Sequence, residues 1–554
     1  MKFAQKGAVV HKSLLMFGGA GLAAACLCAS TAFASATIDQ DTNILTFDVA
    51  SGDETYAQEI PSTVAGIVKT GAGKIVLSVA STGFTGKTVL ISDGVLEIQH
   101  KNALGSGNTV TVANGAQYRM VYNATQNDCG GQNNDIVLQG GAGPDNNGAL
   151  YGTGNGANTA SDYFWGNVTL EADATIGCGS ARGFGKDLDL GGKTLTIKGQ
   201  MRLAGGGVGK TVTVKNPGKI RLASSTICIQ GAPVFNAGGV FEAAGGGIQM
   251  WNVSVPVAWP LHLTDANLTL NMGRGLVGGQ SANPNANVWA GNVEIASGRT
   301  LTLTGNDSYK TDYLSIAGNI TGDGGVSIGG SNAEFRLSGT NTYSGGTAIG
   351  ANRLRVYADG NVSTNGPVKI NGGVLELHLE NAGITSEYVA GLAAKMAQSQ
   401  YSSGNGTLRF ITGAAQDVTL TSDFSPMHPS IAIHHEGDGS LTLSGNMPSD
   451  MQPVNKAGRL DFDGDWARSV WALLVNGGTM DVKGGSLTRP YYDGNRTYRI
   501  GSSNDVASAR MRILNGGTLY FPTTSGDVSE AIKVDDLGTK PGCSAKSGTE
   551  CRAA

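Results

Sequence analysis

The sequence predicts an all-β protein in which many short strands stack into a solenoid, and three observations carry this prediction. Glycine accounts for 85 of the 554 residues, about twice its usual share. Charged residues make up only 15%, so glycine and small polar residues replace the charged helix formers of an ordinary enzyme. One short strand template also recurs along the chain. Collagen is excluded because glycine has no three-residue period, and wholesale disorder is disfavoured because aliphatic residues are plentiful and the net charge is only −4.

The N-terminus has the layout of a secretory signal peptide. Three lysines and no acid precede an apolar run from Leu14 to Ala29, and Ala32-Phe33-Ala34 forms an A-x-A cleavage motif. We therefore expect residues 1–34 to be removed on export, with Ala34-Ser35-Ala36 as an alternative cleavage site. A membrane anchor is the competing interpretation, which the short, glycine-interrupted run disfavours. No later stretch stays apolar for ~18 residues, so no membrane span is expected in the mature chain.

The strand template is a turn residue, usually glycine, followed by a short segment that alternates apolar and polar side chains. It occurs, for example, at Gly192 to Ile197 and Gly372 to Leu377. Such a strand cannot bury its apolar face alone, whereas stacked copies build one continuous core. We expect a solenoid over residues 35–521, with glycines at the corners and on the order of 20 coils, followed by an irregular tail over 522–554. Antiparallel β-sandwiches are the competing architecture, disfavoured because no Asn-Gly hairpin series separates the strands.

One segment, residues 386–400, departs from the strand pattern. Its apolar residues recur at helical spacing, and Ser386 is suited to cap the first turn. We predict a single amphipathic helix that is inserted in the solenoid and packed on its side; a helix that docks a partner is the alternative. The residues at helical spacing are Val389, Leu392, Ala393 and Met396.

Two stretches share a more specific pattern. One runs from Thr321 to Thr347 and contains the string Asn-Thr-Tyr-Ser-Gly-Gly-Thr at 341–347. A degenerate copy begins at Thr70, with Phe84 in place of the tyrosine and Lys87 in place of a glycine. The two regions, residues 64–120 and 315–380, resemble the passenger-associated β-strand repeat of bacterial autotransporters. The resemblance implies a right-handed parallel β-helix that is exported to or beyond the surface of a Gram-negative-type bacterium, where such passengers act as adhesins, scaffolds or aggregation factors.

The chain also departs from this family. Autotransporters end in a β-barrel that delivers the passenger, but here the strand template persists to residue 521 and the remaining 522–554 are too few for a barrel. We therefore expect other proteins to supply the export machinery, with a truncated passenger as the alternative.

Candidate catalytic residues are few. Glycoside hydrolysis needs two carboxylates that face each other across the scissile bond. Acidic residues at the outward template position lie at scattered repeats and are equally explained as solvated strand positions, and Asp535-Asp536 lacks the companion motifs of pectinase-like hydrolases. We predict no enzymatic activity and assign no catalytic residue, with a polysaccharide lyase or glycosidase as the alternative. The outward acids are Glu97, Glu242, Glu376 and Asp481.

Three further motifs are rejected as metal or cofactor sites. Asp461 to Asp465 alternates carboxylates but lacks the glycine and glutamate of a calcium loop, so a solvated corner loop is expected. The sequence His434-His435-Glu436 is not a zinc motif, and a structural or surface role is expected. Gly205 to Thr211 lacks the spacing of a phosphate loop. No metal and no cofactor is therefore predicted.

The expected partners follow from the extended, weakly charged surface: surface glycans or host or matrix proteins. Nucleic acid is not expected, because no lysine- or arginine-rich run is present. Aromatic residues are expected to lie mainly in the core, with carbohydrate contact as the alternative; the candidates are Trp251, Trp259, Trp289, Tyr491 and Tyr492. The pairs Cys178–Cys228 and Cys543–Cys551 are the candidate disulfides, although the odd, sparse cysteines do not form a disulfide framework.

Overall fold

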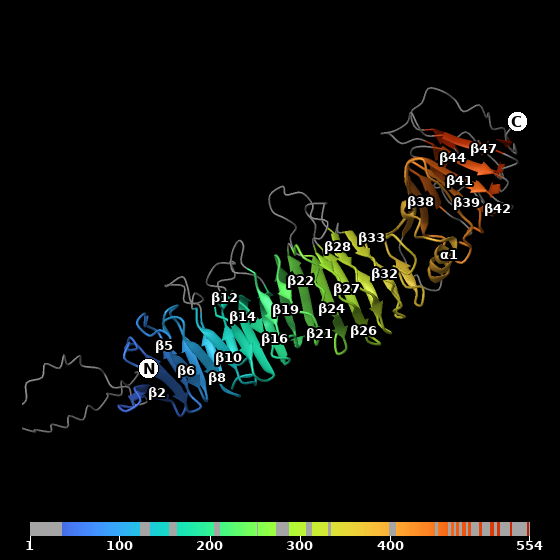
Figure 1. Ribbon diagram of the computed structural model, residues 1–554. Helices are drawn as coiled ribbons and strands as arrows, with labels where there is room; N and C mark the ends of the chain where they lie inside the picture. The colour runs from blue at the N-terminus through green and yellow to red at the C-terminus, as the bar shows by residue number, and fades with distance from the viewer. Residues whose placement is uncertain are drawn as a thin grey trace, which may run out of the picture.

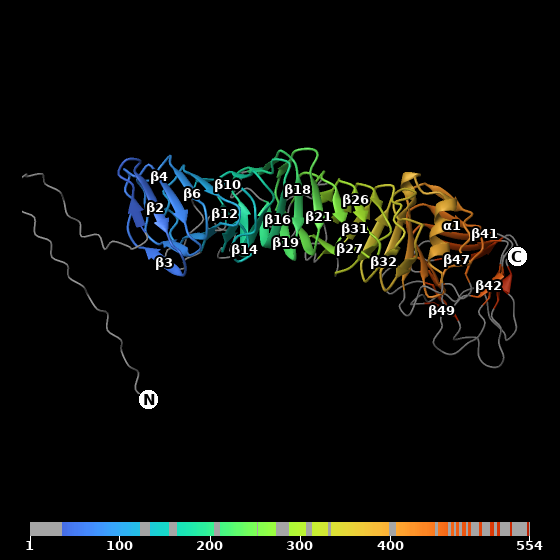
Figure 2. The ribbon, with the colours of Figure 1, turned by 90° about the horizontal axis from the view of Figure 1, so that it is seen from below.

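A computed structural model shows an elongated rod of stacked strands (Figures 1 and 2). It describes residues 36–121, 133–153, 163–164, 166–203, 211–251, 253–272, 287–305, 313–330, 334–397, 406–448, 452–463 and nine short strand segments between 467 and 552. Several predicted features lie outside the described residues: the signal peptide 1–34, positions 205–210 of the glycine-rich loop, Tyr491, Tyr492, Asp535, Asp536 and Cys543.

The strands form parallel sheets that run along the rod, and consecutive strands of one sheet come from successive coils. In the described residues every strand pair is parallel except β1–β2 and β48–β50, so the prediction of a parallel β-solenoid is confirmed and the antiparallel sandwich is rejected. The first sheet has ten strands. They are β1 (Ala36–Ile38), β2 (Ile44–Asp48), β4 (Gly66–Thr70), β6 (Thr88–Ile91), β8 (Thr109–Val112), β10 (Asp135–Leu138), β13 (Val168–Leu170), β15 (Leu188–Asp189), β17 (Thr213–Lys215) and β20 (Val234–Phe235).

Two further sheets share the long strands β14 and β16, which turn a corner of the rod and contribute to both. One consists of β3 (Asp53–Tyr56), β5 (Lys74–Leu77), β7 (Val95–Ile98), β9 (Gln117–Met120), β11 (Leu150–Gly152), β14 (Ala174–Phe184), β16 (Thr194–Leu203), β18 (Lys219–Leu222), β21 (Val240–Ala243), β23 (Leu261–Leu263), β26 (Val293–Ile295) and β29 (Ile320–Thr321). The other adds to β14 and β16 the strands β12 (Tyr163–Phe164), β19 (Ser225–Gln230), β22 (Gly246–Trp251), β24 (Leu268–Met272), β27 (Thr300–Gly305), β30 (Gly325–Ile328), β32 (Thr347–Ile349) and β34 (Val368–Ile370).

An 11-stranded sheet runs through the second half of the rod and carries the site described below. Its strands are β25 (Val288–Trp289), β28 (Tyr313–Ile316), β31 (Glu334–Leu337), β33 (Arg353–Val356), β35 (Val374–His378), β36 (Thr407–Thr412), β38 (Ala432–Gly437), β40 (Gln452–Asn455), β43 (Leu473–Val475), β46 (Tyr498–Ile500) and β49 (Ile532–Val534).

Two shorter sheets complete the C-terminal coils. They consist of β37 (Asp417–Leu420), β39 (Ser440–Leu443), β41 (Arg459–Asp463), β44 (Thr479–Lys483) and β47 (Arg510–Leu514), and of β42 (Ala467–Ser469), β45 (Ser486–Thr488), β48 (Thr518–Tyr520) and β50 (Cys551–Arg552). The solenoid has about 16 turns, fewer than the order of 20 expected. Strands β49 and β50 pair with β46 and β48, so two short strands lie within the range predicted as an irregular tail.

The core is built from apolar side chains that stack in register from coil to coil. Strands alternate buried and half-buried residues, as in β24, where Leu268, Leu270 and Met272 point inward. Each fully buried aliphatic or aromatic side chain contributes about 1.5–3 kcal/mol relative to an exposed one. One such row, fully buried along its whole length, consists of Leu195, Ile220, Phe241, Leu261, Val293 and Ile320.

The template glycines occupy the corners, as predicted. Gly94, which precedes β7, has φ +64°, and a Cβ atom there would lie 2.3 Å from the Gly73 carbonyl oxygen of the preceding coil. Any larger residue would therefore be strained and would also collide with the neighbouring backbone.

The predicted helix is present as α1 (Ser386–Lys395), beside the rod (Figure 1). Val389, Leu392, Ala393 and Met396 are all fully buried, which confirms that the helix packs on the solenoid. The N-cap is Thr385 rather than Ser386, because the Thr385 hydroxyl accepts the backbone N–H of Tyr388. The helix ends at Lys395, earlier than expected. Among the described residues no helix is long and apolar enough to cross a membrane.

The predicted Cys178–Cys228 pairing is wrong. Both cysteines are buried, and neither forms a disulfide. Cys178 pairs with Gly199 on the next coil, and Cys228 pairs with Arg202 on the coil after that. The two cysteines are thus separated by two coil spacings of ~4.8 Å each. That distance exceeds the ~7 Å between Cα atoms that a disulfide can span.

Candidate functional site

Three glutamates occupy the same position in the strand template, where the side chain is expected to point out of the core. Glu97, Glu242 and Glu376 each follow a Gly-Val-Leu or Gly-Val-Phe sequence, and each points away from the apolar core. They are nevertheless only 4%, 7% and 2% exposed. The expectation of solvated strand positions is therefore wrong for these three, because basic side chains of adjacent coils cover them.

The basic partners of these glutamates recur at fixed spacing. Lys74 Nζ lies 3.4 Å from Glu97 Oε2, and Lys219 Nζ contacts Glu242; both lysines stand 23 residues before their glutamate. Arg221, 21 residues before Glu242, contacts the same carboxylate. This spacing is about one coil, so each carboxylate meets cations from the preceding coil. We call this arrangement the glutamate clasp. The sequence does contain a signal for these ion pairs, because a Lys or Arg stands about one coil before each of the three glutamates.

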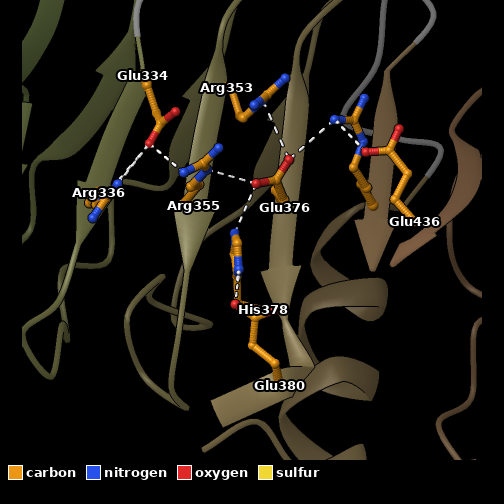
Figure 3. A network of polar contacts seen from close by, with 9 residues as sticks. Glu334, Arg336, Arg353, Arg355, Glu376, His378, Glu380 and Glu436 are labelled. Atoms are coloured by element: carbon orange, nitrogen blue, oxygen red, sulfur yellow. Dashed lines mark hydrogen bonds and ion pairs between the residues drawn. The ribbon is translucent and has the colours of Figure 1, made fainter. Parts of the chain in front are cut away.

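The clasp at Glu376 is the centre of a larger network, which we call the charged band (Figure 3). The band lies across β31, β33, β35, β36 and β38, whose pairing places Arg336, Arg355, Glu376, Arg409 and His434 in one row of adjacent coils. It comprises Glu334, Arg336, Arg353, Arg355, Glu376, His378, Glu380, Arg409 and Glu436.

Glu376 binds basic side chains from its own strand, β35, and from the two neighbouring strands, β33 and β36. Arg353 Nε lies 3.4 Å and Arg409 Nη1 3.2 Å from its Oε2, and Arg355 Nε lies 2.7 Å from its Oε1. His378 Nε2 is 2.8 Å from the same Oε1. Burial alone would raise the pKa of Glu376, but the His378 hydrogen bond and the guanidinium charges outweigh it and lower the pKa to about 2.

The rest of the band extends this network in both directions. Glu334 Oε1 accepts Arg336 Nη2 at 3.1 Å and pairs with Arg355 Nη1 at 2.7 Å. On the other side, Glu436 pairs with Arg409 Nη1 at 3.2 Å and with Lys456 Nζ at 2.5 Å. The band therefore ties successive coils together through alternating cations and anions.

Aromatic rings flank the charges. The Arg336 guanidinium lies 3.5 Å from the centroid of the Tyr313 ring and 5.7 Å from that of Tyr357. The Tyr357 ring in turn stacks on His378 with 4.4 Å between centroids. These four side chains, which we call the stacking ladder, come from four successive coils and are half-buried except for the buried His378.

His378 is the one place where the band brings two carboxylates close to a single ring. Its Nε2 contacts Glu376 and its Nδ1 lies 3.0 Å from Glu380 Oε1. A glycosidase would need one carboxyl of this pair to hold a proton near neutral pH, which requires a raised pKa. The pKa of Glu376 is lowered instead, so Glu376 is suited to holding cations and unsuited to acting as a general acid.

The other sequence candidates do not join the band. Glu97 and Glu242 have clasps of their own on a different sheet. Asp461 lies in strand β41, is 3% exposed and accepts Arg459 Nε at 2.8 Å, so the predicted solvated corner loop is wrong at this residue. Its Cα lies opposite that of Asp481 on the next coil. Among the described residues no group of three or more His, Cys, Asp or Glu side chains is arranged to hold a metal ion.

The histidine pair of β38 is divided between the two faces of the sheet. His435 is fully buried, with Nε2 3.0 Å from Thr412 Oγ1 and Nδ1 2.8 Å from Asn455 Oδ1, which confirms a structural role. His434 faces outward beside Arg409, and burial lowers its pKa to about 4 with help from the charges of Lys456 and Arg409.

The tryptophans lie mainly in the core, as expected. Trp259 and Trp289 are 1% and 0% exposed and pack on Phe241. Trp259 also donates its indole N–H to the Asn236 carbonyl at 2.6 Å. Its ring covers Gly239, where a Cβ atom would lie 2.2 Å from Trp259 Cζ2. These two residues therefore stack the coils and are not available to a ligand.

Comparison with known proteins agrees with the repeat seen in the sequence. The family model for the passenger-associated-transport-repeat matches residues 67–98 and 334–356, within the two regions that resemble it. The chain is 30% identical over 262 residues to "Adhesin BmaC autotransporter" from Brucella suis biovar 1 (strain 1330), an alignment that covers 43% of this chain and 7% of that protein. The chain thus spans less than a tenth of the length of this relative. No solved structure matches.

The second matched region, 334–356, covers β31 and β33 and contains four members of the charged band. The predicted resemblance to an autotransporter passenger repeat protein is therefore confirmed, and the candidate site lies partly inside the repeat.

Proposed function

We propose that this chain is an exported, non-enzymatic, adhesin-like protein of the bacterial surface that binds its target along one face of the rod. The passenger repeat and the adhesin-named relative support export to the surface of a Gram-negative-type bacterium. The observation that carries the binding role is the charged band, because it presents fixed polar groups on consecutive coils.

The mechanism is geometric. Stacked coils hold side chains at a fixed spacing of ~4.8 Å, so a target that lies along the rod meets several weak contacts at once. Such contacts lose little conformational entropy on binding, because the ion pairs already hold Arg336 and Arg355 in place. The targets that suit this surface are surface glycans or host or matrix proteins.

The test uses purified residues 35–554 over immobilised glycans and extracellular-matrix proteins. We expect saturable binding to at least one class, and labelling of intact cells by an antibody against the rod. Heat-unfolded protein is the control, since it keeps the composition but loses the coil spacing. A folded chain that binds neither class, or that stays inaccessible on intact cells, would contradict the proposal.

A carbohydrate-active enzyme is the second candidate, favoured only by the flanking of His378 by Glu376 and Glu380. Its test is the release of reducing sugar from a polysaccharide panel. We expect none. Release that Glu380→Gln abolishes, in a variant with an unchanged melting temperature, would establish the enzyme and overturn the non-enzymatic proposal.

A further inference from the structure

One sheet of the rod has an outer surface that contrasts with the charged band. Its strands β19, β22, β24, β27, β30 and β32 follow one another in the sheet and contain no Asp, Glu, Lys or Arg. Their outward positions are occupied mainly by hydroxyl and amide side chains. In Figure 1, β19, β22, β24 and β27 lie side by side in the green part of the rod. A ligand on these strands would therefore be held without ion pairs.

Trp251 is the aromatic residue of this surface and one of the sequence candidates for carbohydrate contact. It ends β22, where Met250 points into the core and Gln249 and Trp251 point outward. The indole is half-buried and does not belong to the apolar core, whereas Trp259 and Trp289 do. Within the described part of the chain, no aromatic ring and no guanidinium group stacks on it. Unlike the rings of the stacking ladder, the indole therefore keeps a face for a ligand.

Polar groups with free hydrogen-bonding capacity surround the indole. Gln230 lies opposite Trp251 on the preceding coil, and its Oε1 atom is buried without a hydrogen-bond partner. Buried polar atoms are normally paired with protein, water or a ligand, so this oxygen lacks a donor that a ligand hydroxyl is suited to supply. Gln249 stands two residues before Trp251 on the same face, ~6.6 Å away along the strand.

The next two coils continue this polar surface. Asn271 lies opposite Gln249, and Thr304 lies opposite Asn271. Asn271 Nδ2 donates to Thr304 Oγ1 at 2.8 Å, which holds both side chains in place before a ligand arrives. We call Gln230, Gln249, Trp251, Asn271 and Thr304 the amide patch.

The composition of the amide patch selects among ligand classes. A polyanion finds no cation on these strands. A protein partner would need about 800 Å² of buried surface on each side, and a single half-buried indole among hydroxyls and amides supplies little of the apolar area at the centre of such an interface. A sugar ring has an apolar C–H face and a rim of hydroxyl groups. One aromatic face beside several amides matches both features.

We propose that the amide patch binds an uncharged glycan, an inference that rests on the adhesin function above and names a ligand class for it. The C–H face of a sugar ring packs on the Trp251 indole, and its hydroxyl groups bind the side-chain amides of Gln230 and Gln249. The patch and the charged band lie on different sheets, so the two surfaces can be tested separately.

The test compares Trp251→Leu with a matched control, Tyr151→Leu, in purified residues 35–554. Tyr151 is also half-buried on a strand, but it lies on β11, and the Arg119 guanidinium lies 5.4 Å from its ring centroid. The probes are immobilised uncharged oligosaccharides of glucose, galactose and N-acetylglucosamine, with heparin as the polyanion and matrix proteins alongside. We expect Trp251→Leu to weaken binding of an uncharged oligosaccharide about tenfold, which corresponds to about 1.4 kcal/mol, and Tyr151→Leu to leave it unchanged.

Two further variants separate binding from folding. Trp251→Phe keeps an aromatic face and should retain most of the binding. Gln249→Met keeps the length of the side chain but removes its amide, so it should weaken binding, and it decides the test if Trp251→Leu lowers the melting temperature. The oligosaccharide should also change the tryptophan fluorescence of wild type and not that of Trp251→Phe. Salt should have little effect, since screening weakens charge contacts only.

Three outcomes would overturn the inference: glycan binding that both Trp251→Leu and Gln249→Met retain, binding to heparin alone with a steep salt dependence, or binding to matrix proteins alone. All three leave the adhesin proposal intact, because that proposal covers other glycans, other faces of the rod and matrix proteins. Failure of the wild-type chain to bind any oligosaccharide, heparin or matrix protein would overturn both proposals together.

Discussion

The glutamate clasp at Glu376 makes a quantitative prediction about stability. Glu376→Gln removes the negative charge at the centre of three guanidinium groups while keeping the size of the side chain. The pKa of Glu376 is about 2 instead of the ordinary 4.5 of a glutamate. At 1.36 kcal/mol per pKa unit, this difference corresponds to roughly 3 kcal/mol of stabilisation of the folded state at neutral pH. Breaking a buried ion pair by removing one partner costs a similar amount, about 3–5 kcal/mol.

The sign of the pH dependence follows from the lowered pKa. Because the folded pKa lies below the unfolded one, the stabilisation is fully present above about pH 4.5 and is lost as the pH falls toward 2. The Glu376→Gln variant has no carboxyl at this position. It should therefore be less stable than wild type at pH 7, and the difference between the two proteins should shrink on acidification.

The assay is hydrogen exchange of individual strands, because a solenoid can unfold locally. At pH 7 we expect exchange of β33, β35 and β36 to accelerate by up to about a hundredfold, the equivalent of roughly 3 kcal/mol, while β5 to β9 are unaffected. Glu59→Gln is the control, since Glu59 is exposed. Wild-type exchange in Glu376→Gln, or the same acceleration in Glu59→Gln, would refute the view that the clasp stabilises the coils.

The remaining predictions concern single residues elsewhere in the rod. Gly105→Ala should destabilise strongly, by more than about 2 kcal/mol in chemical unfolding, because φ is +55° and a Cβ would lie 1.8 Å from the Phe84 carbonyl oxygen. Gly107→Ala, with φ +69° but no atom within 4 Å, should cost only about 1 kcal/mol, and equal effects would contradict the role of close approach. Burial raises the pKa of Cys228 to about 12, so mass spectrometry should find it unlabelled by a thiol reagent in the native rod and labelled after denaturation. The pKa of His434 is lowered to about 4, so the stability contributed by its neutral form is complete above pH 6.5 and is lost as the pH falls to 4. The protection factors of β38 against hydrogen exchange, which correct for the slower intrinsic exchange in acid, should therefore fall over that range in wild type and less in His434→Gln.

The sequence was sufficient for the repeating architecture. The template segment Gly372 to Leu377 predicts a strand, and β35 forms there with Leu375 and Leu377 fully buried in the core. The helical spacing of Val389 to Met396 likewise predicted α1. Both predictions succeed because the spacing of apolar residues is a local property that follows directly from the backbone geometry of a strand or a helix. The choice of Thr385 over Ser386 as N-cap was beyond this reasoning, because either hydroxyl suits the position and packing against the coil decides.

The candidate site was only partly predictable. The sequence identified Glu97, Glu242 and Glu376 as one class of position, but their partners stand about one coil away along the chain. The spacing between coils varies with loop length, so the residues that face one another are known only once the register is known. The error at Asp461 has a different cause: this residue was expected in a corner loop, but it lies in strand β41 and pairs with Arg459 of the same strand.

The sequence alone therefore determined that this chain is a glycine-cornered solenoid with passenger-type repeats and one inserted helix, since these features depend on local periodicity and turn chemistry. Only the tertiary structure decided which charges meet. Stacking places Glu376 among Arg353, Arg355 and Arg409, and it aligns Tyr357 with His378. These contacts join residues of different coils, and their distances are fixed by the inter-strand hydrogen bonds that set the register.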